Sequence, residues 1–153
     1  MLISTKGRYA LRVMLDLAQH ETDGFISLRD VAERQHISMK YLEMITGCLN
    51  RAGLVRSLRG KNGGYCLAVP ADQCTVSAVV RATEGSLTPV KCPACEGSTC
   101  EQSDGCYTLP VWQKLDQIVE EYLSSVTLAD LLKNGEKPPI TGAGACQNER
   151  ENE

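Results

Sequence analysis

Apolar residues recur at three- and four-residue steps in several segments of the chain, which is the spacing that places them on one face of a helix. The first such segment spans residues 5–20, and its apolar face consists of Tyr9, Ala10, Val13, Met14, Leu17 and Ala18. Ser27 and Ser38 are the expected N-caps of two short helices that end near Arg34 and Ala52. Two short helices with a tight join are typical of a helix-turn-helix, although other helical bundles also contain such pairs.

An alternating pattern of apolar and polar residues follows the second short helix. Residues 54–58 and 65–69 are expected to be strands, and the turn between them, residues 60–64, is rich in residues that tolerate a positive φ. A further short helix is expected over residues 76–84. A helix pair followed by a hairpin predicts a mainly α fold with a small β-hairpin wing. We therefore assign residues 1–84 to a winged helix-turn-helix domain.

The C-terminal half contains one long helical pattern. Pro110 is expected in the first turn of this helix, whose apolar stripe consists of Val111, Trp112, Leu115, Ile118, Val119, Tyr122 and Leu123. The stripe can pack against the first helix of its own chain or form a dimer seam, and we favour a seam that serves both purposes. Thr127 and Asp130 form a near capping box for a short terminal helix. The remaining segments are a cysteine-rich loop (85–109), the dimerisation helix with the terminal helix (110–134), and a polar tail expected to be disordered (135–153).

The charge of the chain is unevenly distributed. The 153 residues carry a net charge of −3, but residues 1–75 contain ten Lys/Arg against seven Asp/Glu and residues 76–153 contain six against twelve. No acidic residue occurs between positions 44 and 71, a stretch that contains Arg51, Arg56, Arg59 and Lys61. Phosphate neutralisation supplies most non-specific nucleic-acid affinity, so a basic region on an acidic protein suits a DNA-binding surface. An ordinary solvated face is the alternative interpretation.

Several classes of protein do not fit the sequence. No run approaches the roughly eighteen apolar residues of a membrane span, and Lys6, Arg8 and Arg12 interrupt any signal-peptide core. We therefore expect a cytoplasmic protein, where eight cysteines indicate metal or redox chemistry more than a disulfide framework. The chain has no dinucleotide or P-loop motif and no nucleophile–base pattern, so we do not expect an enzyme. A small redox or electron-transfer protein is the alternative from another class.

Four cysteines lie close together in the chain, at Cys92, Cys95, Cys100 and Cys106, with the spacing C-x2-C-x4-C-x5-C. Structural zinc sites usually have two paired knuckles, and only the first pair qualifies here. Iron–sulphur clusters tolerate more irregular loops, so we favour a cluster, with zinc binding and thiol or disulfide sensing left open. Of the other cysteines, Cys66 and Cys74 are interpreted as small core residues, whereas Cys48 and Cys146 receive no ligand role.

Four segments together resemble the Rrf-type winged-helix transcriptional regulators, the family of IscR, NsrR and CymR. The segments are STKGRYALRVMLDLA (4–18), ISMKYLEMI (37–45), AGLVRSLRGKNGGYCLA (52–68) and VVRATEG (79–85). The resemblance covers about residues 1–132. It implies a homodimer in which the helix at 110–125 of each subunit crosses its partner. It also implies that the two winged helices grip a palindromic operator in double-stranded DNA.

The resemblance also implies a ligand set, because the cluster-binding branch of the family holds iron with three loop cysteines. Cys100 and Cys106 match the last two, and Cys95 or Cys92 matches the first. The 2Fe-2S branch has a histidine three residues after the last cysteine, where this chain has Leu109. The extra cysteine of the Cys92/Cys95 pair is therefore the natural fourth ligand, and both 2Fe-2S and 4Fe-4S clusters remain open.

The expected function is that of a DNA-binding transcriptional regulator that senses iron–sulphur cluster or redox status. Such a protein would control genes of iron–sulphur assembly or of cysteine and sulphur metabolism. A cluster-free regulator of the same fold that senses zinc or thiols is the alternative. Six side chains are expected to contact phosphates, bases or the minor groove: Ser38, Lys40, Tyr41 and Glu43 on the second short helix, and Arg59 and Lys61 on the wing.

Overall fold

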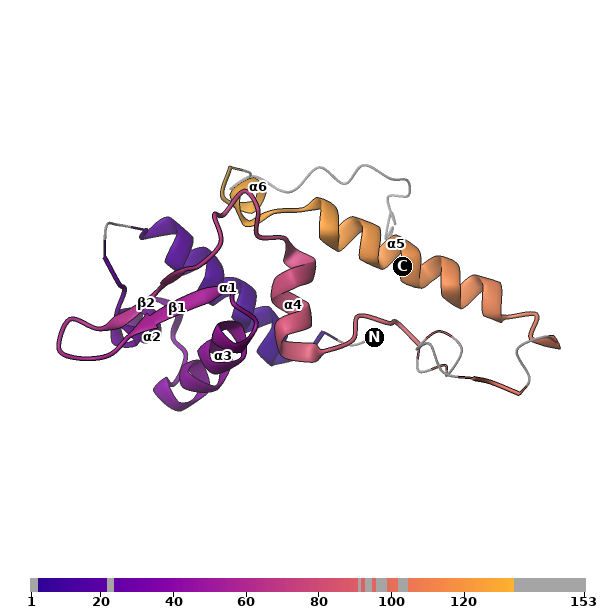
Figure 1. The fold of residues 1–153 in the computed structure, drawn as a ribbon, viewed down its shortest axis with the longest axis horizontal. Coiled ribbons are helices and arrows are strands. Elements are labelled where there is room, and N and C mark those ends of the chain that lie inside the picture. The colour runs from indigo at the N-terminus through magenta and orange to yellow at the C-terminus, as the bar shows by residue number, and fades with distance from the viewer. Residues whose placement is uncertain are drawn as a thin grey trace, which may run out of the picture.

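The computed structural model describes residues 3–21, 24–90, 92, 95, 99–101 and 105–133. Within these residues the elements are α1 (Thr5–Gln19), α2 (Leu28–Gln35), α3 (Met39–Arg51), β1 (Val55–Leu58), β2 (Gly64–Leu67), α4 (Val76–Glu84), α5 (Leu109–Ser125) and α6 (Leu128–Lys133) (Figure 1). No helix in this part of the chain combines the length and apolarity needed to cross a membrane. The tail at 135–153, expected to be disordered, lies outside the described residues.

Polar side chains determine where the helices begin. The hydroxyl of Ser27 accepts a hydrogen bond from the Asp30 N–H at 3.2 Å, and that of Ser38 accepts one from the Tyr41 N–H at 3.4 Å. Both predicted N-caps are therefore confirmed. The predicted helix at 76–84 is confirmed at both ends. The last long helix begins one residue earlier than Pro110, which keeps the proline in the first turn.

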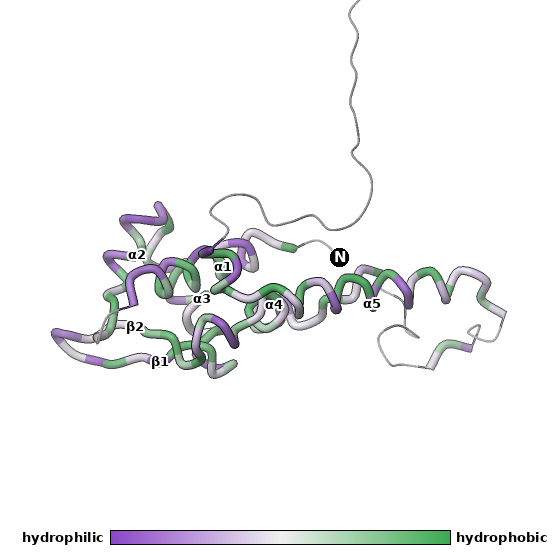
Figure 2. Tube along the Cα trace, turned by 90° about the horizontal axis from the view of Figure 1, so that it is seen from above, coloured by the Kyte–Doolittle hydropathy of each residue, from purple (hydrophilic) through white to green (hydrophobic). Residues whose placement is uncertain are grey.

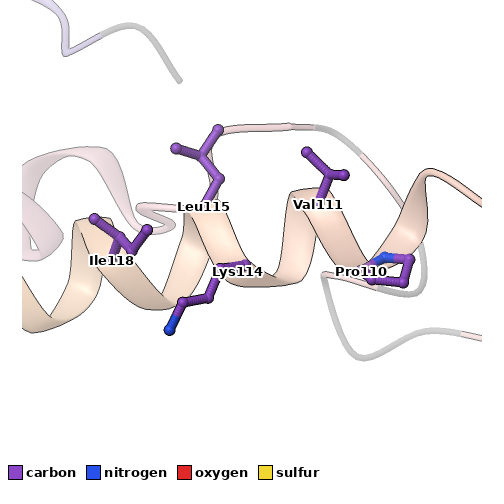
Figure 3. Close-up of a pocket in the computed structure, with 5 residues that line it drawn as sticks. All are labelled: Pro110, Val111, Lys114, Leu115 and Ile118. Carbon is purple, nitrogen blue, oxygen red and sulfur yellow. The ribbon is translucent and has the colours of Figure 1, made fainter.

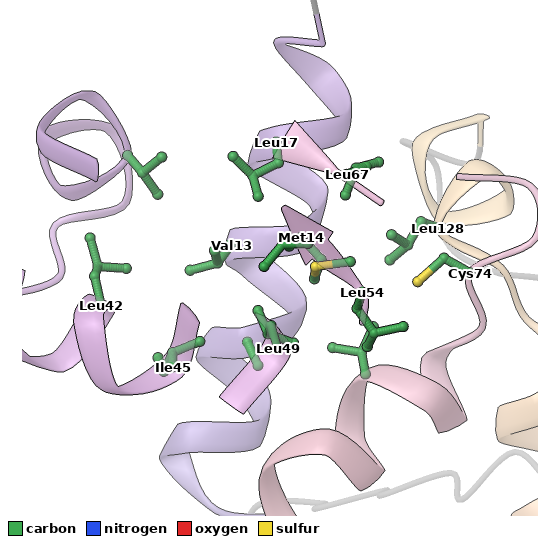
Figure 4. Close-up of a cluster of buried hydrophobic side chains, with 14 of the residues drawn as sticks. Val13, Met14, Leu17, Leu42, Ile45, Leu49, Leu54, Leu67, Cys74 and Leu128 are labelled. Carbon is green, nitrogen blue, oxygen red and sulfur yellow. The ribbon is translucent and has the colours of Figure 1, made fainter. Parts of the chain in front are cut away.

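The hydrophobic core surrounds α1, which packs against α2, α3, α4 and α6. Figure 4 shows side chains of α1 facing those of α3 and the hairpin. The largest buried apolar side chains of these elements are Val13, Met14, Leu17, Leu42, Ile45, Leu49 and Val55. Leu128 of α6 is also fully buried, so the C-terminal helix closes the core of the N-terminal domain.

The hairpin forms a wing beside this core. β1 pairs with β2 in an antiparallel register that places Val55 opposite Leu67. Ile26 adds a third, bridging segment, since its N–H donates to the Tyr65 carbonyl at 2.9 Å and its carbonyl accepts from the Tyr65 N–H at 2.8 Å. β2 ends at Leu67 and not at residue 69 as expected. The chain bends there towards Pro70, which cannot donate a ladder hydrogen bond.

α5 and α6 leave and rejoin the domain in different ways. α5 extends away from the body formed by the other helices (Figures 1 and 2). α6 returns to the body, because the Leu128 N–H donates to the Cys74 carbonyl at 2.9 Å. The capping box that begins α6 is confirmed. The Thr127 N–H donates to Asp130 Oδ2 at 3.0 Å, and the Asp130 N–H donates to Thr127 Oγ1 at 3.1 Å.

The apolar stripe of α5 does not pack against α1 as one of the two expected arrangements required. α5 packs against α4, where Glu120 accepts hydrogen bonds from Ser77 and Arg81. Only Leu123, near the end of α5, reaches the small cluster built on Val80 and Leu87. No residue of α5 is buried. Exposed fractions along the stripe are 59% for Val111, 38% for Leu115, 50% for Ile118 and 51% for Tyr122.

An ion pair between a buried carboxylate and a partly exposed arginine joins α1 to α2. Asp16 is 1% exposed, and its carboxylate accepts hydrogen bonds from Arg34 Nε at 3.0 Å and Gln35 Nε2 at 2.8 Å. Burial by itself raises the pKa of Asp16. The hydrogen bonds from Arg34 and Gln35, with the charges of Arg34 and His20, outweigh burial and lower this pKa below its ordinary value of 3.8. The contact therefore stabilises the fold only while Asp16 is ionised.

We predict that Asp16→Asn lowers the free energy of unfolding by about 2–3 kcal/mol at neutral pH, because it leaves Arg34 without its partner. The folded-state pKa of Asp16 is depressed, so its stabilising contribution is complete above the ordinary value of 3.8 and is lost as the pH falls through the folded value. Urea unfolding of parent and variant at several pH values measures both effects. Glu33→Gln, an exposed change on α2, is the control and should shift stability by less than about 0.5 kcal/mol. If the difference in free energy of unfolding between the parent and Asp16→Asn did not decrease in acid, the prediction would be contradicted.

Candidate nucleic-acid interface and metal centre

One side of α3 is free of the protein core. The opposite side is buried and carries Leu42, Ile45 and Leu49. Three of the four predicted DNA-contacting residues on this helix, Ser38, Lys40 and Glu43, are exposed. The Ser38 Oγ caps the helix, and its hydroxyl hydrogen stays available to an acceptor outside the chain.

Tyr41, the fourth predicted contact on α3, has a different environment. It is half-buried, and its ring lies edge-on to that of Tyr9 with 5.8 Å between the ring centroids and 90° between the planes. The Arg12 guanidinium lies 5.2 Å from the Tyr9 ring centroid and donates to the Gln35 carbonyl at 2.7 Å. Tyr41 thus helps to hold α3 against α1, and Arg12 joins the neighbouring part of α1 to the end of α2. No sequence pattern indicated this role, because Tyr9 and Tyr41 are brought together only by the packing of α1 against α3.

The wing presents its cations at the turn between β1 and β2. Arg59 and Lys61 are both exposed, as a DNA contact requires. Gly60 has a φ of 113°, a conformation that side chains rarely adopt. A β-carbon on Gly63 would lie 2.3 Å from the Leu58 carbonyl oxygen, so this tight turn needs glycine. Arg56 on β1 is also exposed and adds a further cation to the same hairpin.

The four cysteines of the loop lie in the connection from α4 to α5, and all four are half-buried. The Cys95 N–H donates to the Cys92 carbonyl at 2.9 Å, a tight turn that brings the two side chains together. Desolvation raises the pKa of the Cys95 thiol, and a hydrogen bond with Cys92 raises it further. The nearby charges of Asp116 and Cys106 act in the same direction. Cys92, Cys95 and Cys106 are therefore electrostatic neighbours, and Asp116 of α5 is a neighbour that no sequence pattern indicated.

Cys106 lies at the N-terminal end of α5. Its sulfur is 3.4 Å from Thr108 Oγ1, and this contact lowers the pKa of the Cys106 thiol. Hydrogen bonds from the Thr108 and Leu109 N–H groups lower it as well. Metal ligation requires the thiolate, so this position favours the form that binds metal. Among the residues that the structure describes, no three Cys, His, Asp or Glu side chains converge closely enough to hold a metal ion.

The remaining cysteines lie apart from the loop. Cys74 is 1% exposed and belongs to the core, as expected, and burial raises the pKa of its thiol. Cys66 on β2 is half-buried and is not a core residue, so that interpretation is wrong. Its strand borders the exposed wing, which leaves its side chain only partly covered. Cys48 lies 3.3 Å from the Arg51 guanidinium, and Cys146 is outside the described residues.

α5 carries an apolar groove on its exposed face (Figure 3). Its lining comes from the first three turns of the helix: Pro110, Val111, Lys114, Leu115 and Ile118. Large exposed apolar surfaces on small domains mark interaction sites. The groove begins four residues after Cys106, so the cysteine loop and this apolar surface meet at the same end of α5.

Comparison with known proteins identifies relatives over nearly the whole described chain. The family model Rrf2, described as an iron-dependent transcriptional regulator, matches residues 3–134. The HTH-type transcriptional regulator IscR of Erwinia tasmaniensis is 41% identical over 136 residues, which cover 89% of this chain and 81% of the relative. IscR of Yersinia enterocolitica is also 41% identical, over 88% of this chain and 80% of the relative.

Solved structures give the same result. The structure of CymR, the global cysteine regulator of B. subtilis, superposes with a TM-score of 0.72 at 36% identity, covering 87% of this chain and 97% of that one. IscR of T. potens superposes with a TM-score of 0.70 at 40% identity, over 94% of both chains. The relatives are transcriptional regulators and not enzymes, in agreement with the expectation from the sequence. The winged helix and the apolar C-terminal helix are thus parts of a known architecture, and the chain belongs to the Rrf2 family of transcriptional regulators.

Proposed function

We propose that this chain is a homodimeric regulator whose binding to a palindromic operator follows the state of an iron–sulphur cluster held by Cys92, Cys95, Cys100 and Cys106. The observation that carries the proposal is the position of these thiols in the segment that leads directly into α5. A change in this loop acts on the start of the helix that carries the exposed apolar groove. The genes controlled would be those of iron–sulphur assembly or sulphur metabolism, because relatives include IscR and a global cysteine regulator.

The DNA contacts follow from exposure and charge. Lys40 and Glu43 lie on the free side of α3, which would enter the major groove as the recognition helix of a helix-turn-helix. Glu43 can accept a hydrogen bond from the amino group of a cytosine. Arg59 and Lys61 extend the same surface to the phosphates or minor groove beside it.

The donor set suits an iron–sulphur cluster. Thiolates are the ligands such clusters prefer, and a cluster bound here would supply reversible one-electron chemistry and a dependence on iron supply. The lowered pKa of the Cys106 thiol favours the thiolate form that ligation requires. The turn at Cys92–Cys95 presents two sulfurs from adjacent positions. Cys100 completes a set of four from the same loop.

The loop is also the structural link through which the presence or absence of the cluster would alter DNA binding. Thr108 and Leu109 connect Cys106 to the first turn of α5 through hydrogen bonds. α5 in turn is fixed to α4 by the contacts of Glu120 with Ser77 and Arg81. A shift of the loop would therefore change how α5 packs against a second subunit. It would also change the distance between the DNA-binding domains of the two subunits.

Anaerobic purification followed by absorption spectroscopy and counts of iron and sulphide tests the cluster. We expect a coloured protein with iron and sulphide in equal amounts. A mobility-shift assay with holo and metal-free protein tests the coupling to DNA. A colourless protein containing zinc would contradict the cluster assignment.

A second candidate function is thiol sensing, which the hydrogen bond between Cys92 and Cys95 favours. Oxidation would join these two thiols in a disulfide without any cluster. In that case the purified protein is colourless and metal-free, and its DNA affinity changes with thiol oxidants. Mass spectrometry of the alkylated protein then identifies the Cys92–Cys95 bond.

We predict that Arg59→Ala weakens binding to every DNA sequence and reduces the slope of log affinity against log salt by about one. Glu43→Ala should instead change base preference at one position, by about 1–3 kcal/mol. Titrations of operator and random duplexes at several salt concentrations separate the two effects. If both variants bind all DNA like the parent, the DNA surface lies elsewhere.

A further inference from the structure

Gly47 lies in the interior of α3, where glycine is among the least favourable residues. Its backbone is helical and does not require a positive φ. A β-carbon at Gly47 would meet no atom of the described chain within 4 Å apart from its own stretch of helix, whereas one at Gly7 would lie 2.5 Å from a Glu84 carboxylate oxygen and one at Gly64 would lie 2.2 Å from the Ile26 carbonyl oxygen. Contacts within the chain therefore explain Gly7 and Gly64 but not Gly47.

Gly47 lies at the centre of the free side of α3. With about 100° between successive residues, Lys40, Glu43 and Arg51 lie within about 40° of it around the helix axis. The buried residues of α3, Ile45 among them, lie on the opposite side. The midpoint of the free side is thus the half-buried backbone of Gly47, with charged side chains before and after it.

Two exposed methionines flank this free side. Met39 is 42% exposed and Met44 is 44% exposed, although α3 has a buried face that could have taken both. These methionines add exposed apolar surface at the two edges of this side. Residues 44–71 contain no acidic residue, and on this side Lys40 and Arg51 outnumber Glu43, so a polyanion is the partner that fits.

We propose that the sugar–phosphate backbone of duplex DNA passes in van der Waals contact with α3 at Gly47, and that Arg51 pairs with a phosphate there. The proposal deepens the DNA-binding function proposed above and rests on it. The first turn of a recognition helix reads base edges, and Gly47 lies about 6 Å farther along the axis than Glu43, towards the wall of the groove. Only glycine lets a phosphodiester chain approach a helix backbone so closely.

The test compares the parent with Gly47→Ala and Gly47→Leu, using a labelled duplex selected by the parent protein from a random library and a second duplex of unrelated sequence. Ala and Leu have similar helix propensities, so each variant should unfold at a Tm about 3 °C above that of the parent. Affinity should fall about tenfold for Ala and about a hundredfold for Leu, on both duplexes. Gln113→Ala, an exposed change on α5, should leave both affinities unchanged.

Each outcome bears on the proposal. Stability that rises while affinity falls with side-chain size supports it, because a glycine kept only for folding would show neither trend. Variants that bind both duplexes like the parent overturn it and leave the DNA-binding function intact. Loss of affinity for the selected duplex alone also overturns it, because the contact would then be with base edges. A selection in which the parent enriches no duplex contradicts the proposed function itself.

Discussion

Cys100→Ser and Cys106→Ser are each expected to abolish the proposed iron–sulphur cluster and, with it, the proposed difference in operator affinity between holo and metal-free protein. Ligands must converge within a few ångströms, and serine is a harder donor that suits iron–sulphur sites poorly. Cys106 has the additional role of joining the loop to the first turn of α5. Iron content and absorption spectrum of the anaerobically purified variants measure the loss. Unchanged iron in either variant would overturn the assignment of this loop.

Serine variants of the cysteines outside the loop are the controls. Cys48→Ser, Cys66→Ser, Cys74→Ser and Cys146→Ser should each keep the spectrum of the parent. Cys74 is buried, so its variant is expected to lose stability without losing the cluster.

The serine variants of Cys92 and Cys95 test whether both of these residues are ligands. If both are ligands, each single serine variant holds a labile or altered cluster. If one is spare, its variant matches the parent, and the fourth ligand is then sought elsewhere. Asp116, which lies near Cys95, becomes the first described residue to test.

We predict that Ile118→Asp converts the proposed dimer to a monomer and lowers operator affinity by about two to four orders of magnitude, because the second half-site no longer binds at a high effective concentration. Ile118 is 50% exposed and lies in the groove with Leu115 (Figure 3). A charge placed there cannot be buried against a second subunit without a large desolvation cost. Sedimentation measures the oligomeric state, and a mobility-shift assay measures the affinity.

Gln113→Asp is the matched control, since it adds the same charge to an exposed residue of α5 outside the groove. It should leave the dimer and the operator affinity unchanged. Ile118→Asp should retain the parent's helical content, because α5 has no buried residue and the core does not depend on its groove. If Ile118→Asp remains dimeric, the dimer interface does not lie on α5.

Local chemistry allowed much of the fold to be predicted from the sequence. Ser27 and Ser38 cap their helices through hydrogen bonds to the N–H three residues on, a contact that depends only on neighbours in the chain. The capping box of Thr127 and Asp130 is equally local. The wing could be predicted for the same reason, since its turn glycines lie between two short alternating runs.

Residues far apart in the chain decided the rest. The pairing of Asp16 with Arg34 depends on the angle at which α1 and α2 cross, and periodicity carries no information on that angle. Packing against Tyr9 likewise made Tyr41 a residue that positions α3.

The apolar stripe of α5 shows most clearly which features the sequence determines and which the tertiary structure determines. Its apolar period predicted a helix with one face to bury, and the sequence by itself determined that much. Which surface covers that face depends on where the chain turns after α4, because the same stripe can meet its own α1 or a second subunit. In the tertiary structure, Glu120 fixes α5 to Ser77 and Arg81 of α4 at one end of the helix. The groove therefore points away from the core, and its side chains stay exposed because nothing within the described chain reaches them.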